Sequence, residues 1–155
     1  MAVSPIPKGY HTVTAQLSID GAEKAIEFYK KAFGAEVVDQ APDPSGQKIW
    51  HASLRIGDSM LMVNDVFPDM GGSASQSSMW LYVTDVDASF KRAVEAGAKV
   101  TMPLSDMFWG DRLGQIVDPF GQKWALAMRI RDMTHEEQKA AGEAFAAAMS
   151  KDKKP

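Results

Sequence analysis

The chain has 155 residues, of which 45% are hydrophobic and 24% charged, a balance typical of a globular protein. It contains no cysteine, which excludes disulfide scaffolds, thiol catalysis and cysteine-based zinc sites. The net charge of −3 argues against a nucleic-acid surface, and no apolar run approaches the roughly 18 residues of a membrane span. Residues 1–10 lack the apolar stretch of a signal peptide, so we expect a soluble, cytoplasmic protein.

The first predicted elements are a strand and an amphipathic helix. Apolar and polar residues alternate over residues 12–19, the pattern of a strand with one buried face. Asp20 and Glu23 follow at the spacing of a capping box, so we expect Asp20 to cap the helix that begins there. Apolar side chains then recur every three or four residues until Gly34, which is suited to the left-handed conformation that ends many helices.

Three more strands are predicted after this helix, and they complete a βαβββ pattern. They cover residues 36–40, 48–56 and 59–66. Alternation in the second of them places Trp50 and Leu54 on the apolar face and His51 on the opposite face. Residues 67–77 are rich in Gly, Ser, Pro and Asp without periodicity, which indicates a connector.

The same pattern repeats in the second half of the chain. The strand end and capping aspartate at residues 17–20 reappear at residues 81–85, so Asp85 is the second expected helix cap. Gly97 is expected to end the second helix, and residues 118–121, Asp-Pro-Phe-Gly, are expected to form a turn. A repeat of about 63 residues that occurs twice indicates a duplicated unit rather than a solenoid.

We therefore predict one α+β domain over residues 1–155, with two tandem βαβββ modules that form a curved, cup-shaped mixed sheet covered by helices. The expected parts are a first module at residues 10–66, a connector at 67–77, a second module at 78–130 and a C-terminal helix at 134–149. Thr134 and Glu137 have the spacing of a capping box at the start of this helix.

The strand faces opposite the predicted core are mixed, because they combine polar, thioether and aromatic side chains. A solvated face would carry more charge and a core face fewer polar groups, whereas a ligand pocket has this mixture. Flat rings stack on planar or cationic ligands, and methionines adapt to several shapes. The predicted ligand-binding residues are Thr14, Gln16, His51, Met60, Met62, Trp80, Tyr82, Phe108, Trp109 and Asp111.

Alternatives stay open for several of these residues. His51 is either a pocket group or an ordinary half-buried strand histidine, and the aromatic residues either contact a ligand or fill the cup themselves. Asp111 is expected either to pair with Arg112 or to meet a cationic ligand.

Two segments carry a family resemblance: Ala25-Ile-Glu-Phe-Tyr-Lys-Lys-Ala-Phe-Gly34 and Trp109-Gly-Asp-Arg-Leu-Gly-Gln-Ile-Val-Asp-Pro-Phe-Gly121. With the duplicated βαβββ unit, they resemble the vicinal oxygen chelate superfamily, in particular its glyoxalase and bleomycin-resistance branch. The resemblance covers residues 10–130. It implies paired modules with a cup-shaped site between them, and dimers whose sites often lie at the interface.

Metal-dependent members of that superfamily place four ligands, usually His or Glu, on the first and last strands of each module. The resemblance puts these positions at Thr14, Met62, Ser78 and Ala125. A register shifted by two would bring in Asn64 and Trp80 instead. None of these side chains is a good ligand for a divalent metal, so we expect no metal and no cofactor, and an enzymatic role is in doubt.

The predicted function is metal-free binding and sequestration of a small molecule, antibiotic-like and planar or cationic, as the bleomycin-resistance resemblance implies. The alternative is a glyoxalase-like lyase or a dioxygenase with a displaced metal site, and a third possibility is an accessory protein with a vestigial cup. A homodimer is expected for two reasons. The mixed faces are too large for one small cup to protect, and the helix at residues 140–149 offers an apolar face for contact with a second copy. No nucleic-acid or membrane partner is expected.

Overall fold

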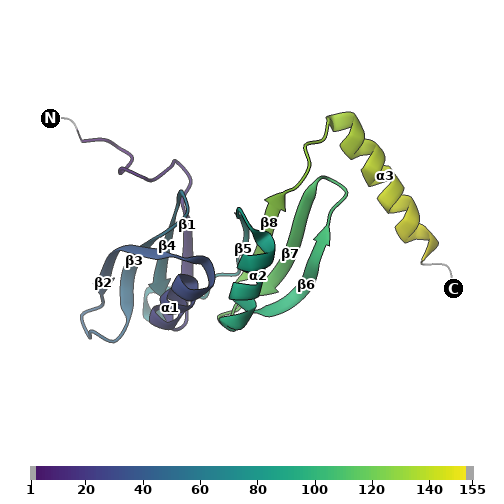
Figure 1. The fold of residues 1–155 in the computed structure, drawn as a ribbon. Helices are drawn as coiled ribbons and strands as arrows, with labels where there is room; N and C mark the ends of the chain where they lie inside the picture. Colours follow the sequence, from purple (N-terminus) through teal and green to yellow (C-terminus); the bar gives the residue numbers. More distant parts are fainter. Residues whose placement is uncertain (1–2, 153–155) are drawn as a thin grey trace.

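In the computed structural model, residues 3–152 form two βαβββ modules and a C-terminal helix (Figure 1). The first module consists of β1 (Ala15–Ile19), α1 (Ala22–Phe33), β2 (Glu36–Pro42), β3 (Ile49–Ile56) and β4 (Ser59–Asp65). The second consists of β5 (Ser78–Tyr82), α2 (Val86–Glu95), β6 (Lys99–Asp106), β7 (Asp111–Val117) and β8 (Lys123–Arg129). Between them lies a short 3-10 helix, η1 (Pro68–Met70), and after β8 comes α3 (His135–Lys151). The predicted α+β class with two modules is confirmed.

Both sheets have the same strand order. The first is ordered β1-β4-β3-β2 and the second β5-β8-β7-β6. In each sheet the first strand runs parallel to the last strand of its module, and the other pairs are antiparallel. A parallel pair needs a crossover connection, which includes the helix of each module. The repeat in the sequence therefore corresponds to two copies of one topology.

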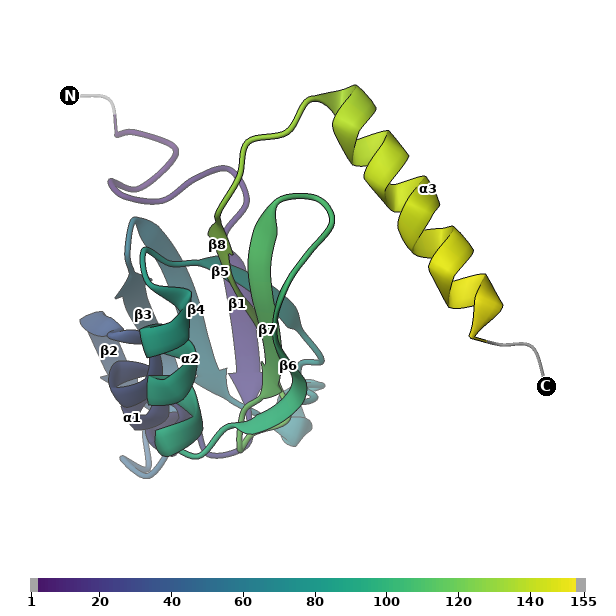
Figure 2. The same ribbon diagram turned by 45° about the vertical axis from the view of Figure 1, so that its right-hand side comes forward.

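One hydrophobic core joins the two modules. α1 and α2 pack against each other, and the two ribbon views both place them side by side (Figure 1 and Figure 2). Phe33 of α1 lies against Trp124 of β8 with ring centroids 4.4 Å apart, and buried residues of both sheets belong to the same cluster. The core thus lies on the helix side of both sheets. We call the opposite face of each sheet its inner face.

Three predicted helix signals are confirmed. Gly34 takes a left-handed conformation, with φ at 67°, at the end of α1. Asp85 accepts a hydrogen bond from the backbone N–H of Ala88 at 3.0 Å and caps α2. Thr134 and Glu137 form the expected capping box of α3.

None of the helices in the described part of the chain is long and apolar enough to cross a bilayer.

The prediction for the start of the first module is wrong in two respects. β1 begins later than predicted, so Val13 is 87% exposed instead of lying in the core. Asp20 does not cap α1, because Gly21 occupies the N-cap position without a side-chain hydrogen bond. The buried Asp65 at the end of β4 accepts instead from the backbone N–H groups of Gly21 and Ala22, at 3.1 and 3.0 Å. A residue distant in sequence therefore replaces the local cap.

Trp50 lies on the opposite face of β3 from the one predicted. The pairing of β2 with β3 shifts register where Ala41 pairs with His51 and Pro42 with Ile49. Because neighbouring residues of a strand point to opposite faces, this bulge turns Ile49 to the core and Trp50 to the inner face. Ile49 is 5% exposed and Trp50 46%.

α3 stands apart from the two modules (Figure 2). None of its residues is buried, and Phe145 and Met149 are about half exposed. Phe145 contacts the second module, with its ring centroid 5.1 Å from that of Phe108. The helix begins as the capping box predicts and continues to Lys151, slightly beyond the predicted end.

Candidate functional site

The first inner face carries a chain of polar side chains across β1 and β4. The register pairs Gln16 with Met62 and Ser18 with Asn64. Nε2 of Gln16 donates to Oδ1 of Asn64 at 3.0 Å, and Nδ2 of Asn64 donates to Oγ of Ser18 at 3.1 Å. Met62 is half-buried beside them, as is Met60 nearer the start of β4. This face therefore offers amide and hydroxyl groups next to thioethers.

His51 and Ser53 form a second polar group on this face. Nε2 of His51 and Oγ of Ser53 are 3.0 Å apart. Tyr10, from the segment before β1, donates its hydroxyl to Oγ of Ser53 at 2.6 Å, and Ser53 is only 2% exposed. The hydroxyl of Thr14 donates to the carbonyl oxygen of His11 at 3.2 Å. Tyr10 is not predicted from the sequence, because it precedes the first periodic segment.

A hollow of about 230 Å³ lies at one end of the first inner face. Gln16 and Asn64 line it together with two aromatic residues, Trp50 and Phe67. The two rings are 5.3 Å apart between centroids, and Nζ of Lys48 lies 5.1 Å from the centroid of Phe67. The sequence predicts neither aromatic residue as part of a site, because alternation assigns Trp50 to the apolar face and Phe67 lies in a segment without periodicity.

The second inner face has two exposed aromatic side chains beside two buried alanines. Trp80 pairs with Ala125 and Tyr82 with Ala127 across β5 and β8. The two rings are 6.2 Å apart between centroids. Trp80 is 48% exposed and Tyr82 57%, although both belong to the sheet. Large exposed aromatic residues grouped on one sheet face are typical of a binding surface.

Asp111, at the start of β7, is the centre of the polar contacts around this face. Its side chain is 1% exposed. Oδ2 accepts from the hydroxyl of Tyr82 at 2.9 Å and from Nε1 of Trp109 at 3.0 Å, and Oδ1 accepts from Nε of Arg129 at 2.8 Å. The hydrogen bond to Asp111 raises the pKa of Arg129 above its usual range. These three donors enclose the carboxylate, which therefore does not face open space. Asp111 instead holds Tyr82, Trp109 and Arg129 in position.

Of the two alternatives expected for Asp111, the pairing with Arg112 is wrong. Arg112 binds Asp87 and Asp106 instead, at 2.8 and 3.0 Å. The partner of Asp111 is Arg129, which is not among the residues predicted from the sequence. Asp111 and Arg129 are directly paired in the register of β7 and β8. Aligning these two strands in the sequence therefore indicates that the two side chains are neighbours.

Phe108 connects α3 to the loop before β7. Its ring makes a T-shaped contact with Trp109 at 5.0 Å and lies 5.1 Å from the ring of Phe145. Trp109 in turn packs against a small cluster that contains Leu113 and Ala127. The predicted residues Phe108 and Trp109 therefore form one wall beside the second inner face.

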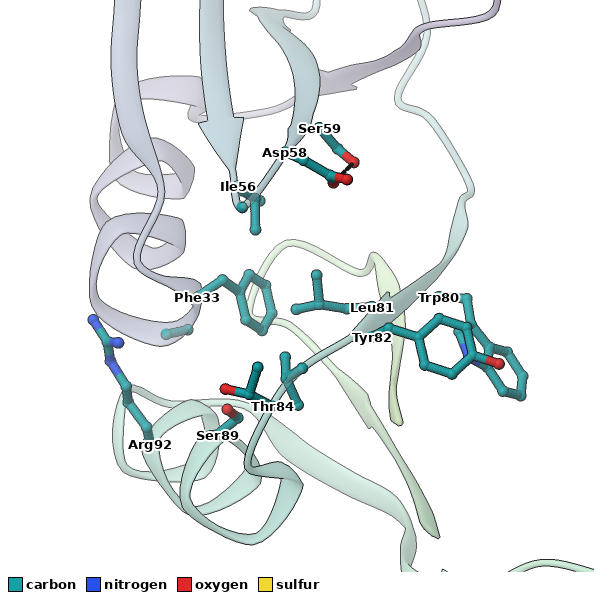
Figure 3. A pocket seen from close by; sticks show the side chains of 13 residues that line it. Phe33, Ile56, Asp58, Ser59, Trp80, Leu81, Tyr82, Thr84, Ser89 and Arg92 are labelled. Carbon is teal, nitrogen blue, oxygen red and sulfur yellow. Dashed lines mark hydrogen bonds between the residues drawn. The ribbon is translucent and has the colours of Figure 1, made fainter. Parts of the chain in front are cut away.

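A cavity of about 570 Å³ borders β5, one of the two edge strands of the second sheet (Figure 3). Phe33 and Leu81 point toward each other in it, whereas Trp80 and Tyr82 project to the other side of the strand (Figure 3). Arg92 also borders the cavity, where its guanidinium donates to backbone carbonyl oxygens at the end of α1. The cavity therefore lies on the core side of β5. Trp80 and Tyr82 are part of its lining, although their rings project to the other side of the strand.

The predicted site residues fall into two groups, one for each sheet. The first group is Thr14, Gln16, His51, Met60 and Met62. The second group is Trp80, Tyr82, Phe108, Trp109 and Asp111. Where these ten residues form side-chain hydrogen bonds or ring contacts with a module, the partner belongs to their own module, and both inner faces lie opposite the shared core. One copy therefore presents two candidate binding surfaces, one on each inner face, which we call half-sites.

The side chains at the four superfamily metal positions do not fit a metal. These positions are Thr14, Met62, Ser78 and Ala125. They provide two hydroxyls, a thioether and a methyl group. The register pairs Met62 with Gln16 and Ser53, Ala125 with Trp80 and Gln115, and Ser78 with Lys123, none of which is a His, Cys, Asp or Glu. Within residues 3–152, no group of three His, Cys, Asp or Glu side chains is arranged to hold a metal ion.

Two tandem βαβββ modules with open inner faces define the class of glyoxalase-like folds. The chain belongs to the Glyoxalase/Bleomycin resistance protein/Dioxygenase superfamily, whose family model matches residues 11–126. The match includes both modules up to β8 and ends before α3, so α3 lies outside the family model.

Relatives and solved structures agree with this membership. Protein Mb0911c of Mycobacterium bovis, an uncharacterized protein, is 42% identical over 138 residues that cover 83% of this chain and 90% of the relative. TioX from Micromonospora sp. ML1 has a TM-score of 0.65 and 25% identity, covering 77% of this chain and 98% of TioX. Protein PA1353 from Pseudomonas aeruginosa has a TM-score of 0.60 and 27% identity, with coverage of 77% and 98%.

Proposed function

We propose that the protein binds and sequesters a small planar molecule without a metal ion. The observation that carries the proposal is the exposed aromatic pair Trp80 and Tyr82 on the second inner face. The chain's own core covers the other face of this sheet, so these rings are available to stack on a ligand. Membership in a superfamily named in part for bleomycin resistance proteins supports small-molecule binding.

The binding cup is formed by two copies of the chain in this proposal. Each copy holds its two half-sites on faces opposite one shared core, which argues against closure within one copy. In a two-fold dimer, the polar groups around Gln16 and Asn64 of one copy face Trp80 and Tyr82 of the second copy, and two equal cups result. The sedimentation mass is then twice the 16.9 kDa of one chain, and a mass of 16.9 kDa at micromolar concentration contradicts the dimer.

Sequestration is favoured over catalysis by the chemistry of the side chains. A metal-dependent lyase or dioxygenase needs ligands that the four superfamily positions do not supply. His51 and Ser53 are within hydrogen-bond distance, but the Ser53 hydroxyl is buried and already bonded to Tyr10, so it is poorly placed as a nucleophile.

A thermal-shift series with quinone, glycopeptide and peptide antibiotics tests the proposal. A compound present at 100 times its dissociation constant adds roughly 2.7 kcal/mol to the free energy of unfolding, which is a readily measured rise in Tm. Metal analysis of the purified protein is the second arm. Stoichiometric Ni, Fe, Mn or Zn, removed by chelation together with an enzymatic activity, would overturn sequestration in favour of a lyase or dioxygenase.

A further inference from the structure

Arg129 lies at the edge of the second inner face and is held there by a buried partner. Its side chain is 49% exposed, and Nε donates to Oδ1 of Asp111 at 2.8 Å. The other carboxylate oxygen of Asp111 is occupied by Tyr82 and Trp109. With both oxygens bonded, the carboxylate is fixed, and it therefore fixes the orientation of the guanidinium.

The guanidinium reaches Asp111 through Nε, and no hydrogen bond from Nη1 or Nη2 to Asp111 occurs. Among the contacts within residues 3–152, Nη1 lies 3.8 Å from Oδ1 of Asp132, too far for a hydrogen bond, and the Asp132 side chain is fully exposed. The hydrogen bond from Nε to Asp111, together with the nearby Tyr82 hydroxyl, raises the pKa of Arg129. Two parallel N–H donors of a fixed guanidinium match the oxygens of a carboxylate or phosphate group.

The aromatic pair and this cation share one sheet face. Tyr82 pairs with Ala127 on β8, and Arg129 follows Ala127 on the same face, while Tyr82 also bonds the carboxylate that holds Arg129. Lys123, at the opposite end of β8, is on the same face and is also positive. Asp111 is buried, so the exposed charged side chains that β8 adds to this face are Lys123 and Arg129.

We infer that the second inner face selects planar aromatic molecules that carry an anionic group, with Trp80 and Tyr82 stacking on the ring and Arg129 binding the anion. This inference rests on the proposed small-molecule function and narrows its ligand class. The expectation of a planar or cationic ligand is thereby reduced to the planar part, because the N–H groups of Arg129 can donate to an anion but not to a cation.

Three naphthalene derivatives with one ring system and different charges test the inference by isothermal titration calorimetry. They are 2-naphthoate, 2-naphthamide and 2-naphthamidine, which are anionic, neutral and cationic. The wild-type protein is expected to bind 2-naphthoate about tenfold or more tightly than 2-naphthamidine, since a hydrogen bond to a charged group is worth roughly that ratio. Arg129→Gln should lose this preference and keep its affinity for 2-naphthamide.

Two further variants control for folding and for net charge. Arg129→Lys keeps the charge without the paired donors and should bind 2-naphthoate with intermediate affinity. Lys91→Gln removes one positive charge from the exposed surface of α2 and should bind all three compounds as the wild type does. The Tm of each variant reports whether it is folded before titration.

The outcomes separate this inference from the proposed function. Equal affinity of the wild type for the three compounds, or unchanged 2-naphthoate affinity in folded Arg129→Gln, overturns the inference and leaves the aromatic binding surface standing. If the wild type binds none of the three compounds, both the inference and the stacking role of Trp80 and Tyr82 are contradicted.

Discussion

The hydroxyl of Tyr29 in α1 donates a hydrogen bond of 2.8 Å to Oδ2 of Asp118, in the turn between β7 and β8. Nε1 of Trp124 donates to the same oxygen at 3.0 Å, and Oδ1 accepts from the backbone N–H groups of Phe120 and Gln122, both at 2.9 Å. All of these contacts lie in or beside the core. The bond thus joins the helix of the first module to a turn of the second and helps to set where the two inner faces point.

The first prediction concerns the pH dependence of stability at this contact. Burial and the carboxylate of Asp118 raise the pKa of Tyr29 above its ordinary value of 10.0. Above pH 10 the unfolded chain releases the phenolic proton while the folded chain retains it, so the free energy of unfolding falls as the pH rises. Tyr29→Phe removes this dependence and, below pH 9, costs about 1–2 kcal/mol through the lost hydrogen bond.

Urea unfolding of the two proteins between pH 7 and pH 11 measures the effect. The advantage of the wild type over Tyr29→Phe should be constant up to pH 9 and then shrink by about 1.4 kcal/mol per pH unit above 10. Parallel curves over the whole range would mean that Tyr29 has an ordinary pKa in the folded protein.

The second prediction compares two aspartates at the start of α1. Asp65 accepts from the backbone N–H groups of Gly21 and Ala22, and its Oδ2 accepts from that of the buried Ile49 at 2.7 Å. Asp65→Ala leaves these donors without a partner and should lower the free energy of unfolding by about 2–4 kcal/mol. Asp20→Ala, at the position the sequence favours, should change it by less than about 0.5 kcal/mol. The reverse order of the two effects, measured by urea unfolding, would restore Asp20 as the cap.

The third prediction compares two tryptophans on the two faces of the second sheet. Trp80 is 48% exposed on the inner face, whereas Trp124 is 3% exposed in the core. Trp80→Ala should weaken ligand binding about tenfold or more and lower stability only modestly, since ring stacking is worth roughly 1–3 kcal/mol. Trp124→Ala should lower the free energy of unfolding by about 3–5 kcal/mol.

Calorimetric titration and Tm measurement distinguish these two variants. The ligand is the compound that stabilises the wild type most in the antibiotic series. A large stability loss in Trp80→Ala with unchanged affinity in the folded fraction would assign Trp80 to packing instead of binding.

The sequence predicts the repeated topology because local patterns determine it. Alternation over β1 and β3, the left-handed Gly34 and the capping box at Thr134 and Glu137 each depend on residues close together in the chain. Repetition of the pattern in the second half then indicates two modules. The mixed character of the inner faces follows from the same alternation.

The features that the sequence does not reveal depend on contacts between distant residues. Trp50 changes face because of a register shift against β2, which the alternation of β3 alone cannot show. Asp65 replaces Asp20 as the cap because the end of β4 lies beside the start of α1. Arg129 is recognised only once β7 and β8 are aligned and Asp111 is seen to be buried. Each case is a tertiary contact that overrides a local signal.

Mixing two defective variants is the most direct test of a cup formed by two copies. Met62→Arg blocks the first inner face and Trp80→Ala weakens the second. In a mixed dimer with cups formed between copies, one cup carries both defects and the other carries none. Refolding the two variants together at equal concentration makes about half of the dimers mixed, and one of the two cups in each mixed dimer is intact. Calorimetric titration with the compound that stabilises the wild type most should therefore find wild-type affinity at about a quarter of the sites. If each copy forms its own cup, every cup carries one defect and no site has wild-type affinity. The absence of wild-type sites in the mixture would therefore contradict a cup formed by two copies.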